Sequence, residues 1–204
     1  MIVEFLGPPA AGKSTVAAAV AERMGVTFRD SPGLKRADGT FVPVWPARRA
    51  AACHLLRQPM LAAALLSRLT SRKAANAASN LSRREGARRR LCDSKLTLVS
   101  EGPLFGVAMM AALGARDPQR LVKRVTQPDV LIELRVDPKE AALRRGNLRR
   151  AHVEKISRVV PLLVAAVDCP VATIDADRPL EDVISAVEAA IRTWTAPKGD
   201  STPP

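Results

Sequence analysis

One eight-residue pattern near the amino terminus constrains the fold of this chain more than any other feature. Residues 7–14 read GPPAAGKS and match G-x-x-x-x-G-K-[ST], between an apolar run at 1–6 and an alanine-rich stretch at 14–24. The two glycines let the backbone curl so that successive N–H groups point into one concavity, and the helix that follows adds positive potential. A strand, a curled loop and a helix in this order predict a phosphate-binding loop.

The residues of this loop divide their roles between phosphate and metal. We expect Lys13 to reach the terminal phosphates of a nucleotide and Ser14 to offer its hydroxyl to Mg²⁺. The other residues assigned to nucleotide binding are Gly7, Ala10, Ala11, Gly12 and Thr15. A plain turn between strand and helix is the alternative, but such a turn does not require the Gly-Lys-Ser sequence.

Short apolar runs alternate with helical stretches along the rest of the chain. Four further strands are predicted at residues 26–29, 96–100, 130–136 and 171–174. Helices are predicted at residues 104–113, 118–125, 139–146, 153–167 and 180–194. Apolar strands separated by helices predict an α/β fold, with a five-stranded parallel sheet and helices on both faces. We assign residues 1–195 to a single domain and the polar, proline-rich residues 196–204 to a disordered tail.

Basic residues are concentrated in one segment. The formal net charge is +12, and residues 46–95 hold twelve Lys and Arg but only two acidic residues, which places +10 there. Such a segment attracts phosphates, nucleic acid or an anionic membrane surface. It is helical in composition over 47–91, with interruptions expected at Pro59 and Gly86. It contains no aromatic residue, so base stacking on single-stranded nucleic acid is not expected there.

Composition argues against several other classes of protein. Apolar residues make up 47% and charged residues 25%, which is typical of a globular chain and not of a disordered one. No apolar run is long enough to span a membrane, and the first residues lack the pattern of a signal peptide. Three widely separated cysteines and two histidines argue against a disulfide framework or a zinc site. We therefore expect a cytoplasmic protein.

Together these features resemble the P-loop small-molecule kinases of the nucleoside-monophosphate and thymidylate kinase-like group. The resemblance covers about residues 1–192, and only the phosphate loop is highly specific. It implies a nucleotide kinase-like P-loop NTPase fold that uses ATP and Mg²⁺. It also implies a helical acceptor-binding insert at 46–95, an arginine-bearing lid at 144–152, and transfer of the γ-phosphoryl group to a nucleotide or nucleoside.

Two carboxylates stand where this group keeps acidic residues. Glu101 follows the third strand, where the family's acid helps to hold Mg²⁺ or accepts the acceptor's proton; capping of the next helix is the alternative. Asp30 follows the second strand, where several relatives carry Glu to meet the acceptor hydroxyl, although Asp before Ser-Pro-Gly equally suits a turn. Which of the two is the base stays open. The family often follows its acid with Arg, whereas Gly102 follows Glu101 here.

Arginines supply the remaining candidates. The lid implies catalytic roles for Arg145 and Arg149, with stabilisation of a helix C-terminus as the alternative. The insert contributes Arg83, Arg84 and Arg88 as candidate acceptor ligands, and a phosphorylated acceptor suits so many arginines best. Phe105 is a candidate to flank an acceptor ring or, alternatively, a core residue.

A second hypothesis is a P-loop ATPase that binds duplex nucleic acid or an anionic membrane surface through the basic insert. The short chain and a third strand that ends in Ser100-Glu101, not Asp-Glu, argue against a nucleic-acid motor. A third hypothesis is a non-catalytic nucleotide binder. Among partners we rank ATP and a small acceptor first and nucleic acid second, and a homodimer stays open.

Overall fold

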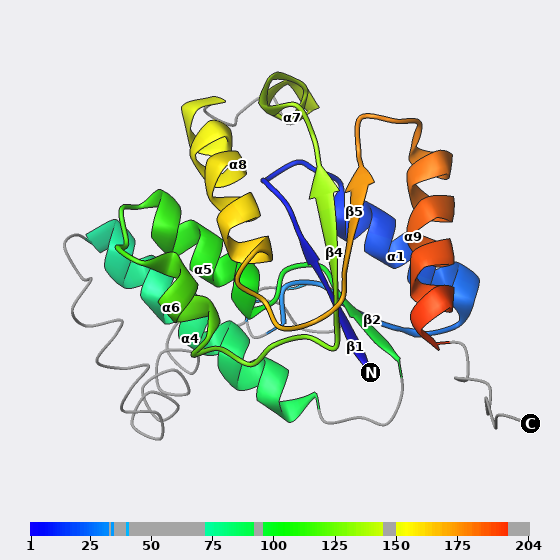
Figure 1. Ribbon diagram of the computed structural model, residues 1–204, viewed down its shortest axis with the longest axis horizontal. Coiled ribbons are helices and arrows are strands. Elements are labelled where there is room, and N and C mark those ends of the chain that lie inside the picture. Colours follow the sequence, from blue (N-terminus) through cyan, green and yellow to red (C-terminus); the bar gives the residue numbers. More distant parts are fainter. Residues whose placement is uncertain (33, 35–39, 41–71, 92–95, 145–149, 196–204) are drawn as a thin grey trace, which may run out of the picture.

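The computed structural model describes residues 1–32, 34, 40, 72–91, 96–144 and 150–195, and a parallel β-sheet lies at its centre (Figure 1). Its five strands are β1 (Ile2–Leu6), β2 (Thr27–Arg29), β3 (Thr97–Val99), β4 (Val130–Arg135) and β5 (Val171–Asp175). They pair in the order β2-β3-β1-β4-β5, and every pairing is parallel. The predicted five-stranded parallel sheet is therefore confirmed.

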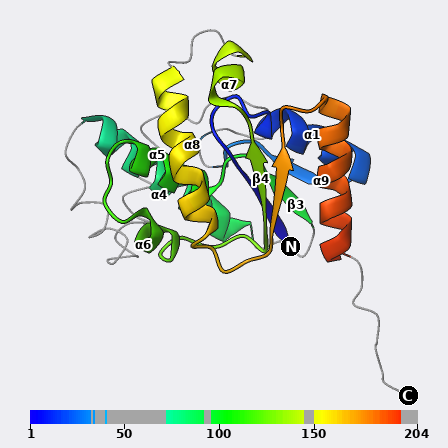
Figure 2. The same ribbon diagram turned by 45° about the horizontal axis from the view of Figure 1, so that its top comes forward.

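Helices cover both faces of this sheet. They are α1 (Lys13–Met24), α4 (Arg72–Arg90), α5 (Pro103–Ala112), α6 (Pro118–Val122), α7 (Pro138–Arg144), α8 (Arg150–Val164) and α9 (Leu180–Thr195). Figure 2 shows α1 and α9 on one side of the sheet and α5, α6 and α8 on the other. The two faces belong to two separate clusters of buried apolar side chains.

The burial of the strands explains their composition. All five residues of β1 are buried, because β1 has a strand on each side and helices on both faces. Its side chains alternate, so Val3 and Phe5 join the cluster under α1 and α9 while Leu6 joins the cluster under α5 and α8. Glu4 points to the same side as Leu6, so a fully buried acid lies on the α5 side of the central strand.

The predicted element boundaries hold to within a few residues, with two differences. Gly86 does not interrupt the insert helix, because it lies inside α4. Its neighbours Glu85 and Ala87 are both buried, and their packing stabilises the helix around the glycine. The predicted lid at 144–152 is helical at both ends, since Arg144 closes α7 and Arg150 opens α8. Its centre with Arg145 and Arg149, the insert before residue 72 and the tail at 196–204 lie outside the described residues.

The strand order also determines where a ligand would bind. The helix after β1 packs on one face of the sheet and the helix after β3 packs on the other, while β1 and β3 are neighbours. In open parallel sheets a crevice forms at such a point, outside the carboxyl ends of the strands. The loop with Lys13 follows β1, Asp30 follows β2 and Glu101 follows β3, so all three lie at this edge of the sheet. No helix in the described part of the chain is long and apolar enough to cross a bilayer.

Candidate active site

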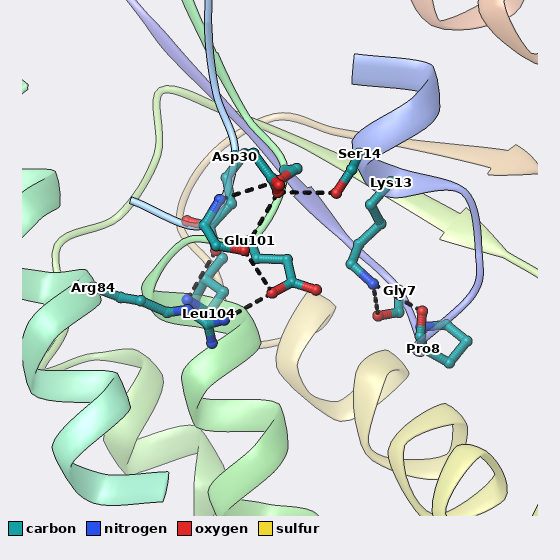
Figure 3. A network of polar contacts seen from close by, with 11 residues as sticks. Gly7, Pro8, Lys13, Ser14, Asp30, Arg84, Glu101 and Leu104 are labelled. Carbon is teal, nitrogen blue, oxygen red and sulfur yellow. Dashed lines mark hydrogen bonds and ion pairs between the residues drawn. The ribbon is translucent and has the colours of Figure 1, made fainter. Parts of the chain in front are cut away.

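The loop after β1 has the curled backbone that the sequence predicts. Ala10 and Gly12 both adopt left-handed conformations, with φ of 65° and 84°. Lys13 opens α1, yet its side chain is only 4% exposed because it turns back into the loop. Its Nζ donates to the carbonyl oxygens of Gly7, at 3.0 Å, and Pro8, at 2.8 Å (Figure 3). The ammonium group is thus held inside the concavity of this loop.

Asp30 lies directly beside this loop. The hydroxyl of Ser14 donates to Oδ1 of Asp30 at 3.0 Å, and the hydroxyl of Ser100 donates to the same oxygen at 2.7 Å. The second strand therefore delivers its carboxylate to the hydroxyl that we predicted as a magnesium ligand (Figure 3). Asp30 does sit at a turn, as the Ser-Pro-Gly sequence indicates, and this turn brings it to the site.

Ser31 joins the two predicted carboxylates. Its Oγ lies 3.3 Å from Oδ1 of Asp30 and 3.0 Å from Oε2 of Glu101, so its single proton lies between the two acids. The backbone of Ser31 is left-handed, with φ of 46°, which is costly for a residue with a side chain. Strain of this kind persists only where surrounding contacts hold it, and here the contacts are those of the candidate site.

Arg84 of α4 completes this group. Its Nη2 donates to Oε2 of Glu101 at 2.7 Å, and the arginine is 4% exposed (Figure 3). Burial lowers the pKa of the Arg84 guanidinium, whereas Glu101, Glu4 and Asp30 act in the opposite direction. Arg84 and Glu101 therefore form a charge-balanced pair at the wall of the crevice.

Phe105 lies between the two cations of the site. Lys13 Nζ is 4.5 Å from the centre of its ring and Arg84 Cζ is 5.1 Å from it. These are distances for cation–π attraction. Phe105 is buried and belongs to the cluster under α5 and α8, so it is at once a core residue and a contact of the site.

The three insert arginines predicted to bind the acceptor have different surroundings. Arg88 lies one helical turn beyond Arg84, but its Nη2 donates to the carbonyl oxygen of Gln127, at 3.0 Å, in the loop before β4. It thus points toward the amino ends of the strands, away from the phosphate loop. Arg83 is partly buried, and desolvation lowers the pKa of its guanidinium. Arg84 thus contacts the predicted catalytic residue Glu101, whereas the described bond of Arg88 goes to Gln127.

A cleft of about 440 Å³ adjoins the outer side of the phosphate loop. Its lining includes Ala10, Ala11, Gly12 and Thr15, four of the residues predicted to bind a nucleotide. Arg144 and Arg178 also line it, and Arg144 is held there by the Ala176 carbonyl at 3.0 Å and by Asp177. Sequence analysis missed Arg178, because nothing in its local sequence connects it with a loop more than 160 residues earlier.

Glu4, not Glu101, caps the helix that follows β3. The N-cap residue Gly102 offers no side-chain bond, while Oε1 of Glu4 accepts the backbone N–H of Leu104 at 2.9 Å. Glu101 instead accepts from Ser31 and Arg84. The capping alternative for Glu101 is therefore wrong, because a carboxyl group from β1 already occupies that position. The one sequence signal for Glu4 was an acid inside an otherwise apolar strand.

Burial raises the pKa of Glu4 to about 8, despite the opposing effects of the Leu104 and Phe105 N–H groups and of Arg88 and Arg84. Between pH 4.5 and 8 the folded protein therefore keeps a proton that the unfolded chain has released. Folding stability should fall as pH rises through this window, by up to about 1.4 kcal/mol per pH unit from this group. A Glu4→Gln variant should lose this slope, as urea unfolding of both proteins from pH 5 to 8 would show. Parallel slopes would contradict a raised pKa.

Ser14 and Glu101, the two residues predicted to hold Mg²⁺, carry oxygen atoms of the kind that this ion prefers as ligands. This ion is usually held by one or two protein oxygen ligands together with substrate phosphates and water. Ser14 opens α1 beside Lys13, and Glu101 is joined to Asp30 through Ser31. Within the described ranges no group of three or more His, Cys, Asp or Glu side chains gathers to hold a metal alone. The donor set present is thus a partial one, which phosphate oxygens would complete.

The sheet order and the loop after β1 define a P-loop NTPase fold of the nucleotide kinase-like type. In structure the chain is similar to deoxyadenosine kinase from M. mycoides. With bound dATP, that enzyme gives a TM-score of 0.62 at 15% identity, over 94% of this chain and 100% of the other. With the products dCMP and a flexible dCDP, the values are 0.61 and 16%, over 95% and 100%. With bound dCTP they are 0.52 and 16%, over 95% and 100%.

This likeness confirms the predicted fold over nearly the whole chain. No protein-family model matches the sequence, and no curated protein matches it. At identities this low a structural likeness establishes the arrangement of helices and strands, while the chemistry has to be argued from the residues of the site.

Proposed function

We propose that this protein transfers the γ-phosphoryl group of ATP, with Mg²⁺, to a hydroxyl group of a small acceptor that is a nucleoside or nucleotide. The observation that carries this proposal is the hydrogen bond between Ser14 of the phosphate loop and Asp30, at 3.0 Å. It places a carboxylate beside the position where the terminal phosphate of a nucleotide would lie. The similar folds that bind dATP, dCTP and dCMP are consistent with nucleotide substrates.

The donor nucleotide has a complete set of candidate contacts. The loop backbone from Gly7 to Gly12 and the ammonium of Lys13 would hold its phosphates, because both present positive charge to one concavity. The cleft of about 440 Å³ beside Thr15 would take its base and ribose, with Arg144 and Arg178 also in its lining. Planar guanidinium groups stack well on aromatic rings, which suits a purine.

The two acids suit different tasks. We assign Glu101 with Ser14 to Mg²⁺, which when bound neutralises charge on the phosphate oxygens. Asp30 accepts hydrogen bonds from two hydroxyl groups, since Ser14 and Ser100 both donate to its Oδ1. We therefore assign Asp30 to the acceptor hydroxyl, whose proton it would accept during transfer. The lid arginines Arg145 and Arg149 stay proposed stabilisers of the transferring group.

The charge balance favours an acceptor without a phosphate group. Arg84 is paired with Glu101, and Arg88, one helical turn further along α4, donates to the backbone carbonyl of Gln127. The surface beside Phe105 thus offers the acceptor an arginine that is already paired with Glu101. A nucleoside suits this surface better than a nucleoside monophosphate does, contrary to the expectation from the arginine count.

The decisive experiment measures ADP release with Mg·ATP and a panel of nucleosides, deoxynucleosides, nucleoside monophosphates, sugars and aminoglycosides. We expect nucleosides to accelerate ADP release and to appear as monophosphates. A parallel arm titrates duplex DNA across salt concentrations. Acceptor-independent ATP hydrolysis, together with duplex binding that falls steeply with salt, would replace our proposal with the nucleic-acid alternative.

Arg84 provides a more specific test. An Arg84→Met variant should raise the acceptor KM and lower kcat, together by about tenfold or more in kcat/KM, while the KM for ATP changes little. The reason is that Glu101 loses a charged hydrogen bond, worth about 1.5–3 kcal/mol, at the wall that faces the acceptor. Steady-state kinetics with each substrate varied in turn would measure both constants.

Arg88→Met is the matched control for this variant. Arg88 lies on the same helix, is buried to a similar degree and also bonds an oxygen outside the helix. Its loss should lower the unfolding free energy by a similar amount with a much smaller effect on the acceptor KM. Equal rises of the acceptor KM in both variants would show that Arg84 has no special place in the site.

A further inference from the structure

Glu4 and Gly102 share one small space between β1 and α5. A Cβ atom on Gly102 would stand 2.4 Å from Oε2 of Glu4, closer than any real contact allows. A side chain at position 102 would therefore require the Glu4 carboxyl group to move away from the first turn of α5. The guanidinium beside Glu101 comes instead from α4, through Arg84.

The contacts of Glu4 lead from the phosphate-loop strand to the acceptor side of the site. Glu4 lies on β1, which runs directly into the loop with Lys13, and its Oε1 accepts the N–H of Leu104 in the first turn of α5. The next residue, Phe105, lies between Lys13 and Arg84. Glu4 is thus connected to both cations through the first turn of α5, because it bonds Leu104 and the adjacent Phe105 contacts Lys13 and Arg84.

We propose that Glu4 is a positioning residue for the phosphoryl transfer proposed above: by capping α5 from within β1, it sets Phe105 and hence the relative placement of Lys13 and Arg84. This inference rests on the proposed function. Reactive groups must be held to well under an ångström for full activity, and a cap that fixes the first turn of a helix supplies that precision. A residue that acts in this way contacts no substrate itself.

Burying an acid at position 4 is costly, and capping of α5 is the structural role that explains it. Glu4 is fully buried, and its Oε2 has no hydrogen-bond partner among the described residues. Its strand neighbours Val3 and Phe5 are apolar, and an apolar residue at position 4 would avoid the cost of burying a carboxyl group. What an apolar residue cannot do is accept the N–H groups of the first turn of α5, which are buried and would lose their partner.

The test compares Glu4→Gln with Glu4→Leu. Both side chains resemble glutamate in size, but only glutamine keeps an oxygen that can accept the Leu104 N–H. We expect Glu4→Gln to stay within about threefold of wild-type kcat/KM for the acceptor. We expect Glu4→Leu to lose about tenfold or more while remaining folded, with the KM for ATP nearly unchanged. Wild-type acceptor kinetics in folded Glu4→Leu would overturn the proposal.

A second comparison tests the shared space directly. Gly102→Ala in the wild-type background should reduce kcat/KM at least as much as Glu4→Leu does, because the new methyl group displaces the carboxyl. In a Glu4→Ala background the same change should cost much less, since the space is open. Effects that simply multiply in the double variant would show that the two residues act independently and would refute this part of the proposal.

Hydrogen exchange keeps the inference separate from the proposed reaction. The Leu104 and Phe105 amides should exchange faster in Glu4→Leu than in wild type or Glu4→Gln, whether or not an acceptor is known. Unchanged exchange would overturn the role of Glu4 as a cap. Absence of acceptor-dependent turnover in the wild-type protein would instead refute the proposed function and leave the exchange result valid.

Discussion

We expect a Lys13→Ala variant to lose phosphoryl transfer by about a thousandfold or more, the scale seen when one preorganised charge is removed from a transition state. Lys13 Nζ lies inside the loop, where it would meet the terminal phosphates and compensate the charge that spreads over their oxygens. Its present partners, the Gly7 and Pro8 carbonyls, hold it there with two hydrogen bonds. The measurement is kcat for acceptor-dependent ADP formation.

The fold should survive this change. Among the described contacts the variant loses two hydrogen bonds and one cation–π contact, but it also removes a buried charge, and the desolvation cost of that charge offsets part of the loss. Lys123→Ala is the matched control, because Lys123 is an exposed lysine at the end of α6 and should leave kcat unchanged. Turnover within tenfold of wild type in a folded Lys13→Ala protein would refute phosphate binding by this loop.

The parts of the site that follow local rules could be predicted from the sequence. The phosphate loop is a continuous pattern between a strand and a helix, so one stretch of sequence determines its backbone curl and the place of Lys13. Asp30 and Glu101 could be found because each follows a strand, and carboxyl ends of parallel strands meet at one edge. The five strands themselves could be found from short apolar runs at helix-length spacing.

Contacts between distant segments could not be predicted. Arg84 and Arg88 lie four residues apart on one helix and are chemically the same, and only the packing of α4 sends one to Glu101 and the other to Gln127. Glu4 looked like a polar residue in a short strand, because its partner at Leu104 is 100 residues away. The sequence likewise could not show that Arg84 and Arg88 already have partners within the fold, which under the proposed function reduces the charge that they offer to an acceptor.

An Asp30→Asn variant should lower kcat by about a hundredfold or more and change the KM for ATP by no more than severalfold. Asparagine keeps the size of Asp30 and an oxygen that accepts from Ser14 and Ser100, so the turn and its contacts should persist. It removes the charge and the ability to take a proton from an acceptor hydroxyl, and losses of this kind span about 10²–10⁴. Steady-state kinetics at saturating Mg²⁺ would measure the effect.

Glu101→Gln is the comparison that decides between the two acids. If Glu101 holds Mg²⁺ with Ser14, its variant should require more Mg²⁺ for half-maximal rate and should recover part of its activity at high Mg²⁺. Asp30→Asn should show no such recovery, because added metal does not replace a proton acceptor. The opposite pattern, with recovery in Asp30→Asn alone, would exchange the two roles. The hydrogen bond between Ser14 and Asp30 also places Asp30 close enough to share a metal ion with Ser14. The magnesium titration, more than the loss of kcat, therefore identifies which acid is the base.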